Sequence, residues 1–227
     1  PEPVPQAMIY KEFKRCCMSI LMLSVTDVII TTFFNAINKS EDLISLDPSH
    51  YLTIESLKSF EAFNPSFGFR LLLLILWSDF HFYLIHSIQH KSKFLYKNVH
   101  KIHHESINTN IWSGLSFHPV ESLLYFSALY IVLVLPVSKL EFTFYKMGLI
   151  LAPIGGHWGY WITKDRKSNT NLSAIDHYVH HVKFNYNYGS GIIPVPSNGI
   201  WDNVLGTAWY KGKEGVELFF GKDGKNE

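Results

Sequence analysis

Charged side chains are scarce in this sequence of 227 residues. They make up 17% of the chain, whereas hydrophobic residues make up 47%; the charged share of an ordinary soluble domain is about 25%. The net charge is only +1, so no overall field would attract nucleic acid, and we expect no nucleic-acid partner. This composition favours a membrane protein.

Cysteines and cofactor motifs are also few. The two cysteines, Cys16 and Cys17, are adjacent in the sequence, which excludes a framework of disulfides. The sequence contains no glycine-rich dinucleotide loop and no haem motif, so we expect no NAD, flavin or haem bound to this chain. Any redox chemistry would therefore take its electrons from another protein.

Long apolar runs are present. A helix needs about 20 residues to cross a bilayer, and four stretches come close to that length, at about residues 16–37, 67–88, 123–137 and 142–162. Only residues 138–141 separate the last two, which predicts a helical hairpin, with Pro136 helping to end its first arm. We predict an all-α integral membrane bundle of about four transmembrane helices. The alternative is a soluble bundle with four buried helices.

The distribution of cationic residues predicts how these helices are oriented. Short cytosolic loops carry an excess of Lys and Arg. The segment before the first apolar stretch, the loop after the second and the segment after the fourth all carry such residues, whereas the connection over residues 38–66 is rich in Asp and Glu. The cationic residues are Lys11, Lys14, Arg15, Lys91, Lys93, Lys97, Lys101, Lys164, Arg166 and Lys167. We therefore expect the histidine-rich segments to form a helical cap on the cytosolic side.

Histidine is the unusual residue type, because eleven of the 12 histidines lie between His81 and His181. Eight of them form three clusters, His86-Ser-Ile-Gln-His90, His100-Lys-Ile-His103-His104 and His177-Tyr-Val-His180-His181. Residues three and four apart share one face of a helix, so each cluster directs its imidazoles to one side. Imidazole binds iron, zinc, copper and nickel, and eight such ligands are too many for one ion. The clusters therefore predict a site for two metal ions.

The remaining histidines need separate interpretations. A polar side chain near the mouth of a membrane hairpin needs a partner, so we expect His157 to be a further metal ligand. For His118, a ligand and a structural residue are equally good interpretations. For His50 and His81 we favour ordinary structural roles.

The motifs together resemble the fatty acid hydroxylase and sterol desaturase superfamily. The resemblance covers about residues 79–207 and rests on the three histidine clusters, on an isolated histidine before the last cluster, and on their flanking residues. The flanking motifs are Asp79-Phe-His-Phe-Tyr83-Leu-Ile-His86, Phe117-His-Pro-Val-Glu121, Phe184-Asn-Tyr-Asn-Tyr-Gly189 and Trp201-Asp-Asn-Val-Leu-Gly-Thr207. The last of these are most similar to sterol desaturases of the lathosterol oxidase type.

The resemblance implies one domain over residues 1–227, with a catalytic core at 79–207 that holds two iron ions and uses dioxygen as co-substrate. One iron would be bound by His86, His100, His103, His177 and His180, and the other by His90, His104, His157 and His181, with His118 or water as a further ligand. Each ligating imidazole should donate its second N–H to a carboxylate or a carbonyl. The candidate carboxylates are Asp79, Glu105, Glu121, Asp176 and Asp202.

The resemblance also implies an enzyme that desaturates or hydroxylates a lipid, for which we expect a sterol. A fatty acid or sphingolipid hydroxylase is the alternative within the superfamily. The implied electron donor is a cytochrome b-type protein fed by NAD(P)H, and the implied location is the endoplasmic reticulum membrane. Two alternatives come from other classes, a histidine-rich membrane metal transporter, for which only Asp27 would suit, and a structural zinc site, which closes with four ligands.

Overall fold

The computed structural model of the protein describes residues 4–38, 65–158, 172–190 and 199–208. The acidic connection, His50, the end of the fourth predicted span and the cationic residues after it lie outside the described residues. The elements within the described ranges are all helical, which confirms the predicted all-α class there. They are α1 (Gln6–Asn38), α3 (Pro65–Lys91), α4 (Lys93–Asn98), the 3₁₀ helices η3 (His100–Glu105) and η4 (Ser113–Leu115), α5 (Pro119–Phe126), the 3₁₀ helix η5 (Ser127–Leu133), α6 (Lys139–His157), α7 (Leu172–Val182) and α8 (Ile200–Val204).

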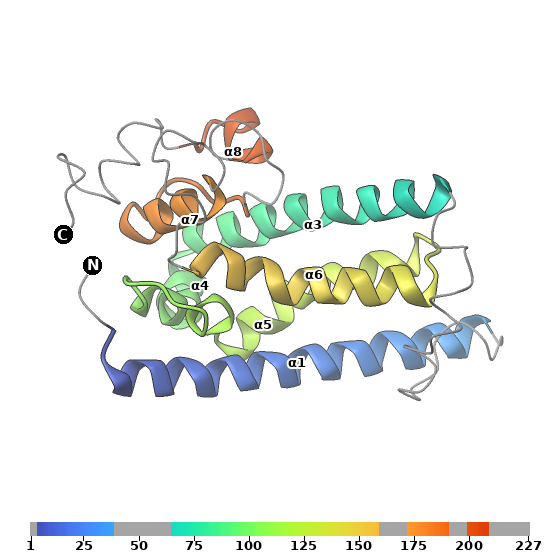
Figure 1. The fold of residues 1–227 in the computed structure, drawn as a ribbon, viewed down its shortest axis with the longest axis horizontal. Helices are drawn as coiled ribbons and strands as arrows, with labels where there is room; N and C mark the ends of the chain where they lie inside the picture. Colours follow the sequence, from blue (N-terminus) through green and yellow to red (C-terminus); the bar gives the residue numbers. More distant parts are fainter. Residues whose placement is uncertain (1–3, 39–64, 159–171, 191–198, 209–227) are drawn as a thin grey trace.

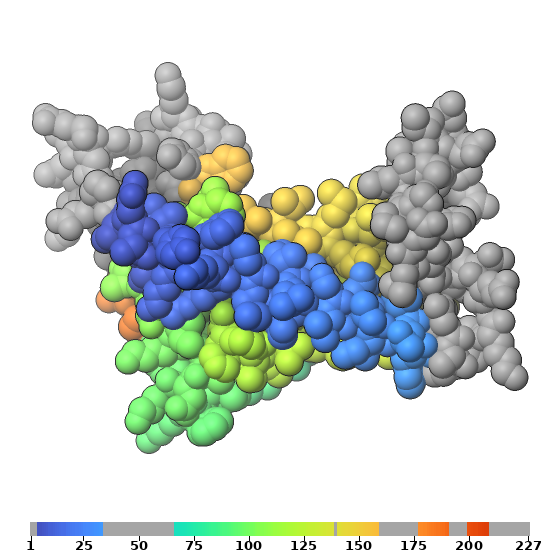
Figure 2. Space-filling model, turned by 90° about the horizontal axis from the view of Figure 1, so that it is seen from below, coloured from blue at the N-terminus to red at the C-terminus, as the bar shows by residue number. Residues whose placement is uncertain are grey.

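Three long helices, α1, α3 and α6, run along the long axis of the molecule, and α4, α7 and α8 gather at one end of it (Figure 1). Within the described residues, two helices are long and apolar enough to cross a membrane, over Gln6–Phe33 and Ser66–Lys91. They correspond to the predicted spans 16–37 and 67–88. Helix α1 lies along the outside of the bundle (Figure 2), and it leaves large apolar side chains exposed, among them Leu21, Ile29 and Phe33.

The other two predicted spans are shorter or more polar than expected. In place of a continuous helix over 123–137, the chain forms the short helix α5 and then η5, which together cover Pro119–Leu133. Helix α6 is 19 residues long and carries Lys139, Glu141 and Lys146. The predicted number of four crossings is therefore not decided by the length and composition of these helices.

Local sequence signals fix where the shorter helices begin. The side chain of His118 accepts a hydrogen bond from the backbone of Val120, and Pro119 occupies the first turn of α5, where a missing N–H costs nothing. Ser138 and Glu141 form a reciprocal capping box at the start of α6. The core between α1, α3, α5, η5 and α6 contains fully buried side chains such as those of Ile30, Leu74, Leu115, Phe126 and Leu129.

Proline 153 interrupts the hydrogen bonding of α6 and is compensated by another helix. A proline has no N–H to donate to the carbonyl four residues earlier, which here belongs to Leu149. The Tyr125 hydroxyl donates to this carbonyl at 2.8 Å. The break in α6 thus becomes a contact between α5 and α6, next to the segment that ends at His157.

Candidate metal centre

Nine histidines from four separate segments converge at one end of the bundle in two groups. The first group contains His86 and His90 of α3, His100 and His104 of η3, and His180 of α7, and the second contains His103 of η3, His157 of α6, and His177 and His181 of α7. Within each group, the candidate ligand nitrogens all lie within 4.8 Å of one another. The structure therefore brings together the three predicted clusters and His157.

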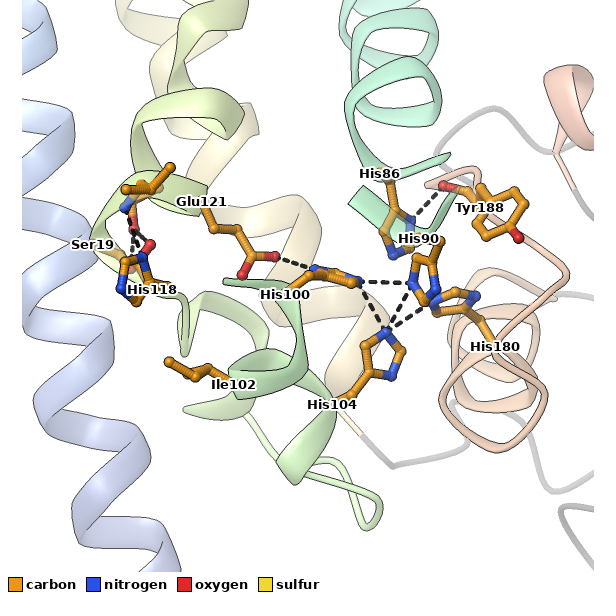
Figure 3. A network of polar contacts seen from close by, with 12 residues as sticks. Ser19, His86, His90, His100, Ile102, His104, His118, Glu121, His180 and Tyr188 are labelled. Atoms are coloured by element: carbon orange, nitrogen blue, oxygen red, sulfur yellow. Dashed lines mark hydrogen bonds and ion pairs between the residues drawn. The ribbon is translucent and has the colours of Figure 1, made fainter. Parts of the chain in front are cut away.

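The ring nitrogens of the first group lie close together. The Nε2 atoms of His90, His100 and His104 form a triangle with sides of 2.8, 3.0 and 3.0 Å, and the Nε2 atom of His180 lies 3.2 Å from that of His104 (Figure 3). In the second group, the Nε2 atoms of His177 and His181 are 3.2 Å apart. Two nitrogens that bind one ion at about 2.1 Å and at right angles lie about 3 Å apart. These separations fit a shared cation.

Hydrogen bonds at the opposite ring nitrogens fix which nitrogen faces the metal position. The Nδ1 atom of His86 contacts the Tyr188 carbonyl oxygen at 2.8 Å, and that of His180 contacts the Tyr186 carbonyl oxygen at 2.6 Å. Because a carbonyl only accepts, each Nδ1 carries the proton and each Nε2 keeps its lone pair. The Nε2 atom of His86 is buried and has no hydrogen-bond partner among the described residues, as expected for a metal ligand.

Two further histidines are held in the same tautomer by side chains. The Nδ1 atom of His100 contacts Oε1 of Glu121 at 2.6 Å (Figure 3). The Nδ1 atom of His157 contacts Ser113 Oγ at 2.8 Å, and because the Ser113 hydroxyl already donates to the Asn110 carbonyl, it must accept from His157. Such outer partners orient ligating imidazoles and raise their basicity. The Nε2 atom of His157 is again buried and without a partner in the described part of the chain.

Asp202 shapes the loop that supplies the two carbonyl partners. Its carboxylate accepts hydrogen bonds from the backbone N–H groups of Tyr188 and Gly189, at 2.8 and 2.7 Å, and from the Thr207 hydroxyl at 2.7 Å. The contact needs glycine, because a Cβ at position 189 would lie 2.7 Å from the Asp202 carboxylate. Burial raises the pKa of Asp202 and these hydrogen bonds oppose the rise. Asp202 therefore acts on His86 through the backbone of residues 188–189.

The histidines of η3 and α7 are held in the neutral form that binds metals. Burial lowers the pKa of each well below 6.5, because the charged imidazolium loses its hydration, and repulsion between neighbouring imidazolium charges lowers it further. These residues are His100, His103, His104, His177, His180 and His181. The site thus presents uncharged donors to a cation at neutral pH.

The predicted division of the ligands between two ions was wrong, and both three-residue pairs were wrong in the same way. We expected His100 and His103 to share one ion, and likewise His177 and His180. In the structure, the pairs four residues apart stay together, and the histidine three residues after the first joins the other group. Adjacent residues such as His103 and His104 point in directions about 100–120° apart around a helix axis, which separates them between the two groups. In α7, His177 and His181 are four residues apart and share a face. Helix period alone does not explain the same pairing in η3, because residues three apart eclipse in a 3₁₀ helix.

His118 and His81 lie outside both groups. His118 caps α5 through its Nδ1 atom, so the predicted ligand role for this residue has no geometric support. His81 is buried, and its Nε2 atom lies 2.9 Å from Ser127 Oγ.

Of the predicted carboxylate partners, only Glu121 contacts a grouped histidine within the described residues. Asp79 accepts a short hydrogen bond from Ser190, and Glu105 pairs with Lys11 and Arg15 at 2.8 Å on the surface. The side chain of Asp176 lies outside the described residues.

Sequence reasoning missed three kinds of partner. The carbonyls of Tyr186 and Tyr188 and the hydroxyl of Ser113 carry no recognisable signal, because any residue has a carbonyl and serine is common. Glu12 of α1 was also missed. It is fully buried, accepts a short hydrogen bond from Ser106 and one of 2.6 Å from Asn110, and so attaches α1 to the segment between His104 and Ser113.

A cavity begins at the second group and extends between the helices. Its metal-side wall is formed by His103, His157 and His177, and its far wall includes Ala128 and Leu149. Leu149 is eight residues before His157 on α6, which corresponds to about 12 Å along a helix. The cavity has a volume of about 40 Å³. Part of an apolar chain or ring could therefore approach the histidines from within the bundle.

The sequence comparisons agree with this site. A family model described as fatty acid hydroxylase matches residues 71–207. The chain is 28% identical over 147 residues to the very-long-chain aldehyde decarbonylase GL1-9 of Oryza sativa subsp. japonica, covering 62% of this chain and 54% of that protein. It is 28% identical over 156 residues to sphinganine C4-monooxygenase 1 of Arabidopsis thaliana, covering 66% and 56%.

A third relative is the Delta(7)-sterol 5(6)-desaturase ERG3 of Saccharomyces cerevisiae, with 31% identity over 138 residues, covering 59% of this chain and 34% of that protein. The matched region thus spans about a third to just over half the length of these relatives. No solved structure matches the chain.

Proposed function

Because this chain belongs to the fatty acid hydroxylase family, we propose that it is a membrane-bound, non-haem di-iron oxidoreductase that uses dioxygen to hydroxylate or desaturate a lipid. The observation that carries the proposal is the convergence of nine histidines, eight of them buried, in two groups. Two such groups provide ligands for two ions, and the Nε2 atoms of His86 and His157 have no hydrogen-bond partner among the described residues.

Nine histidines would hold the two ions. His86, His90, His100, His104 and His180 would bind one, and His103, His157, His177 and His181 the other. When bound, the iron pair would supply the redox chemistry that activates dioxygen for the oxidation of an unactivated C–H bond. An all-imidazole set suits iron but also zinc, copper and nickel, so the metal is assigned from the family.

The protein residues around the ions would hold them and position the substrate. Glu121, Ser113 and the carbonyls of residues 186 and 188 keep the imidazoles in the tautomer that exposes Nε2. Apolar side chains of the cavity, including Phe82, Phe117 and Leu149, would exclude water and align a lipid with the second group. The reacting carbon would lie at the histidine end, and the apolar body would lie between the helices.

The substrate, the electron donor and the membrane topology are proposed from the relatives and from the sequence. A sterol is our proposed substrate, because sterol desaturases are among the relatives; a sphingoid or fatty acyl chain is the alternative. The electrons would come from a cytochrome b-type donor. We further propose four crossings of the endoplasmic reticulum membrane, with the histidines on the cytosolic side, on the basis of the exposed lysines around α4 and η3.

Among the described residues, the groups of side chains that could bind a metal ion are the two histidine groups, which gives the transporter alternative no second binding position along the bundle. Its candidate residue in the spans, Asp27, forms an ion pair with Lys146 of α6 at 2.8 Å. This pair neutralises Asp27 and links α1 to α6, so the carboxylate serves helix packing. No described contact connects Asp27 to the grouped histidines.

A comparison of two histidine substitutions tests the proposed function. Wild-type protein and the variants His103→Ala and His118→Ala would be produced in cells, and both iron content and the lipid profile would be measured by mass spectrometry. We expect about two iron ions per chain and a new oxidised lipid with the wild type and with His118→Ala, and the loss of both with His103→Ala. A wild type that binds metal but oxidises no lipid would refute the enzyme, and equal effects of the two substitutions would refute the assigned ligands.

A further inference from the structure

The cavity beside the second group has a polar point on its wall at His81 of α3, which contacts Ser127 of η5 from behind the wall. The other cavity-lining residues are mostly apolar, and include Phe82, Phe117, Ala128, Leu149, Ala152 and Pro153. His81 is buried, packs beside Trp77 with 5.6 Å between ring centroids, and lines the cavity. A buried polar side chain in an apolar wall is costly unless its hydrogen bonds are made.

The hydrogen bonds of Ser127 determine the tautomer of His81. The Ser127 hydroxyl donates its single hydrogen to the Leu124 carbonyl at 2.7 Å. At the 2.9 Å contact between Ser127 Oγ and His81 Nε2, the serine oxygen must then accept, so His81 carries its proton on Nε2. The lone pair of a neutral imidazole in this tautomer is on Nδ1. Within the described part of the chain, no hydrogen bond reaches that nitrogen.

The other polar side chains of the cavity wall have no hydrogen left to donate. Tyr125 donates its hydroxyl hydrogen to the Leu149 carbonyl and Ser78 to the Leu74 carbonyl, at 2.8 and 2.9 Å, and Ser190 donates to Asp79. Away from the metal-facing histidines, these walls therefore offer acceptors and no side-chain donors. A ligand with a hydroxyl group would gain a hydrogen bond there, whereas a ligand with only a carbonyl or an ether oxygen would not.

The position of His81 relates this acceptor to the reacting end of the cavity. His81 precedes His86 by five residues on α3, which is about 7.5 Å along a helix, and the cavity that it lines ends at His103, His157 and His177. A hydroxyl group bound at His81 would thus lie near the carbon that faces the metal position, and not at the far end of a long chain.

We propose that His81, positioned by Ser127, is a specificity-determining residue that selects lipids with a hydroxyl group close to the oxidised carbon. This inference rests on the proposed function for the identity of the oxidised carbon, but the binding preference stands independently of catalysis. Sterol alcohols and sphingoid bases both contain such a hydroxyl group. The shared chemistry is a hydrogen-bond donor on an otherwise apolar molecule.

Binding measurements with matched lipid pairs test this proposal. The purified full chain in detergent would be titrated with a Δ7 sterol 3-alcohol and its 3-deoxy analogue, and separately with sphinganine and its 3-deoxy analogue, with dissociation constants from tryptophan fluorescence. One hydrogen bond predicts about a tenfold preference for the alcohol in the wild type. The pair that shows this preference identifies the lipid class. Equal affinity within both pairs would overturn the proposal.

Three variants assign the preference to His81. His81→Leu removes the acceptor, and the ratio of the two affinities should fall to about one. Ser127→Ala preserves the imidazole but removes the group that fixes its tautomer, so the ratio should fall by a smaller factor. Ser24→Ala, a serine on the exposed part of α1 that bonds only within its own helix, should keep the wild-type ratio. An unchanged ratio in both His81→Leu and Ser127→Ala would overturn the proposal, even if one of them folds poorly.

Product analysis separates this result from the proposed function. If the wild type prefers the alcohols but forms no oxidised product from any of them, the oxidoreductase is refuted and the hydroxyl-binding site is retained. If products form without any preference that depends on His81, the reverse holds.

Discussion

At the scale of single residues, Glu121 links the first histidine group to helix α5. It is buried at the start of α5 and contacts Nδ1 of His100. Burial raises the pKa of Glu121 well above its usual value, whereas a bound cation would favour its charged form. A carboxylate in this position would make the imidazole a stronger electron donor and prevent the ring from turning. The Nδ1 atoms of His86, His180 and His157 have neutral partners, namely two carbonyls and one hydroxyl.

We expect Glu121→Gln to lower the affinity for metal by about 10–100-fold. The amide oxygen can still accept from His100, but it has no negative charge to stabilise the metal-bound ring. The measurement is competition between the protein and a chelator for Fe(II) or Zn(II). Glu105→Gln is the matched control, since Glu105 forms surface ion pairs with Lys11 and Arg15, and such pairs contribute about 0–1 kcal/mol. Equal losses in the two variants would contradict the role of Glu121.

Sequence reasoning was sufficient for most of the candidate ligands but not for their assignment to two ions. The spacing within each cluster marks the residues that share a helix face. It does not specify how two helices face each other. The way the helices face each other places His100 and His104 in the first group, and His177 and His181 in the second. The outer partners were harder to predict, because backbone carbonyls of any residue can accept from an imidazole.

At the scale of elements, the end of α6 is held in place by a close contact with η4. A Cβ atom at Gly114 would lie 2.5 Å from the Pro153 carbonyl oxygen, so only glycine allows this approach. The contact lies next to Ser113, whose hydroxyl accepts from His157. The position of a metal-facing histidine therefore depends on a contact between two backbones.

We expect Gly114→Ala to destabilise the protein by roughly 1–3 kcal/mol through overpacking and to reduce metal occupancy at the second group. Thermal unfolding in detergent and metal analysis would measure the two effects. Gly148→Ala in α6 is the control, because nothing lies within 4 Å of a Cβ atom at that position and alanine is the better helix former by about 1 kcal/mol. The prediction fails if both alanines are tolerated equally.

The extent of the helices could be predicted from apolar runs only where the runs are long. Residues 16–37 and 67–88 were predicted as spans, and both lie within the long helices α1 and α3. The run at 123–137 gives a short α-helix and then the 3₁₀ helix η5. There, the Ala128 carbonyl accepts from Trp77 and Tyr145, at 2.9 and 3.0 Å. These contacts come from other helices, so no local pattern could show them.

For the whole molecule, acid should release the metal and weaken the fold together. Six histidines of η3 and α7 have pKa values well below 6.5 in the folded protein, and an unfolded chain returns them to about 6.5. Above that pH both states are neutral and these residues contribute no pH dependence. As pH falls below about 6.5, the unfolded chain binds protons that the folded chain cannot, so stability decreases by up to about 1.4 kcal/mol per pH unit for each histidine.

Thermal unfolding of the metal-free protein between pH 8 and pH 5 measures this effect, with retention of iron by the loaded protein followed over the same range. We expect a nearly constant melting temperature above about pH 7 and a steep fall below about pH 6.5. A melting temperature that rises on acidification would contradict the burial of neutral imidazoles.

The interleaving of the two histidine groups has a consequence for how the centre assembles. Each of the segments 100–104 and 177–181 supplies ligands to both groups, so a segment cannot be ordered around one ion without also placing ligands for its neighbour. The first ion to arrive would bear most of the entropic cost of fixing both segments, and the second would find its ligands already in place. Loading should thus be cooperative, with chains that carry a single ion remaining a minor species throughout a titration.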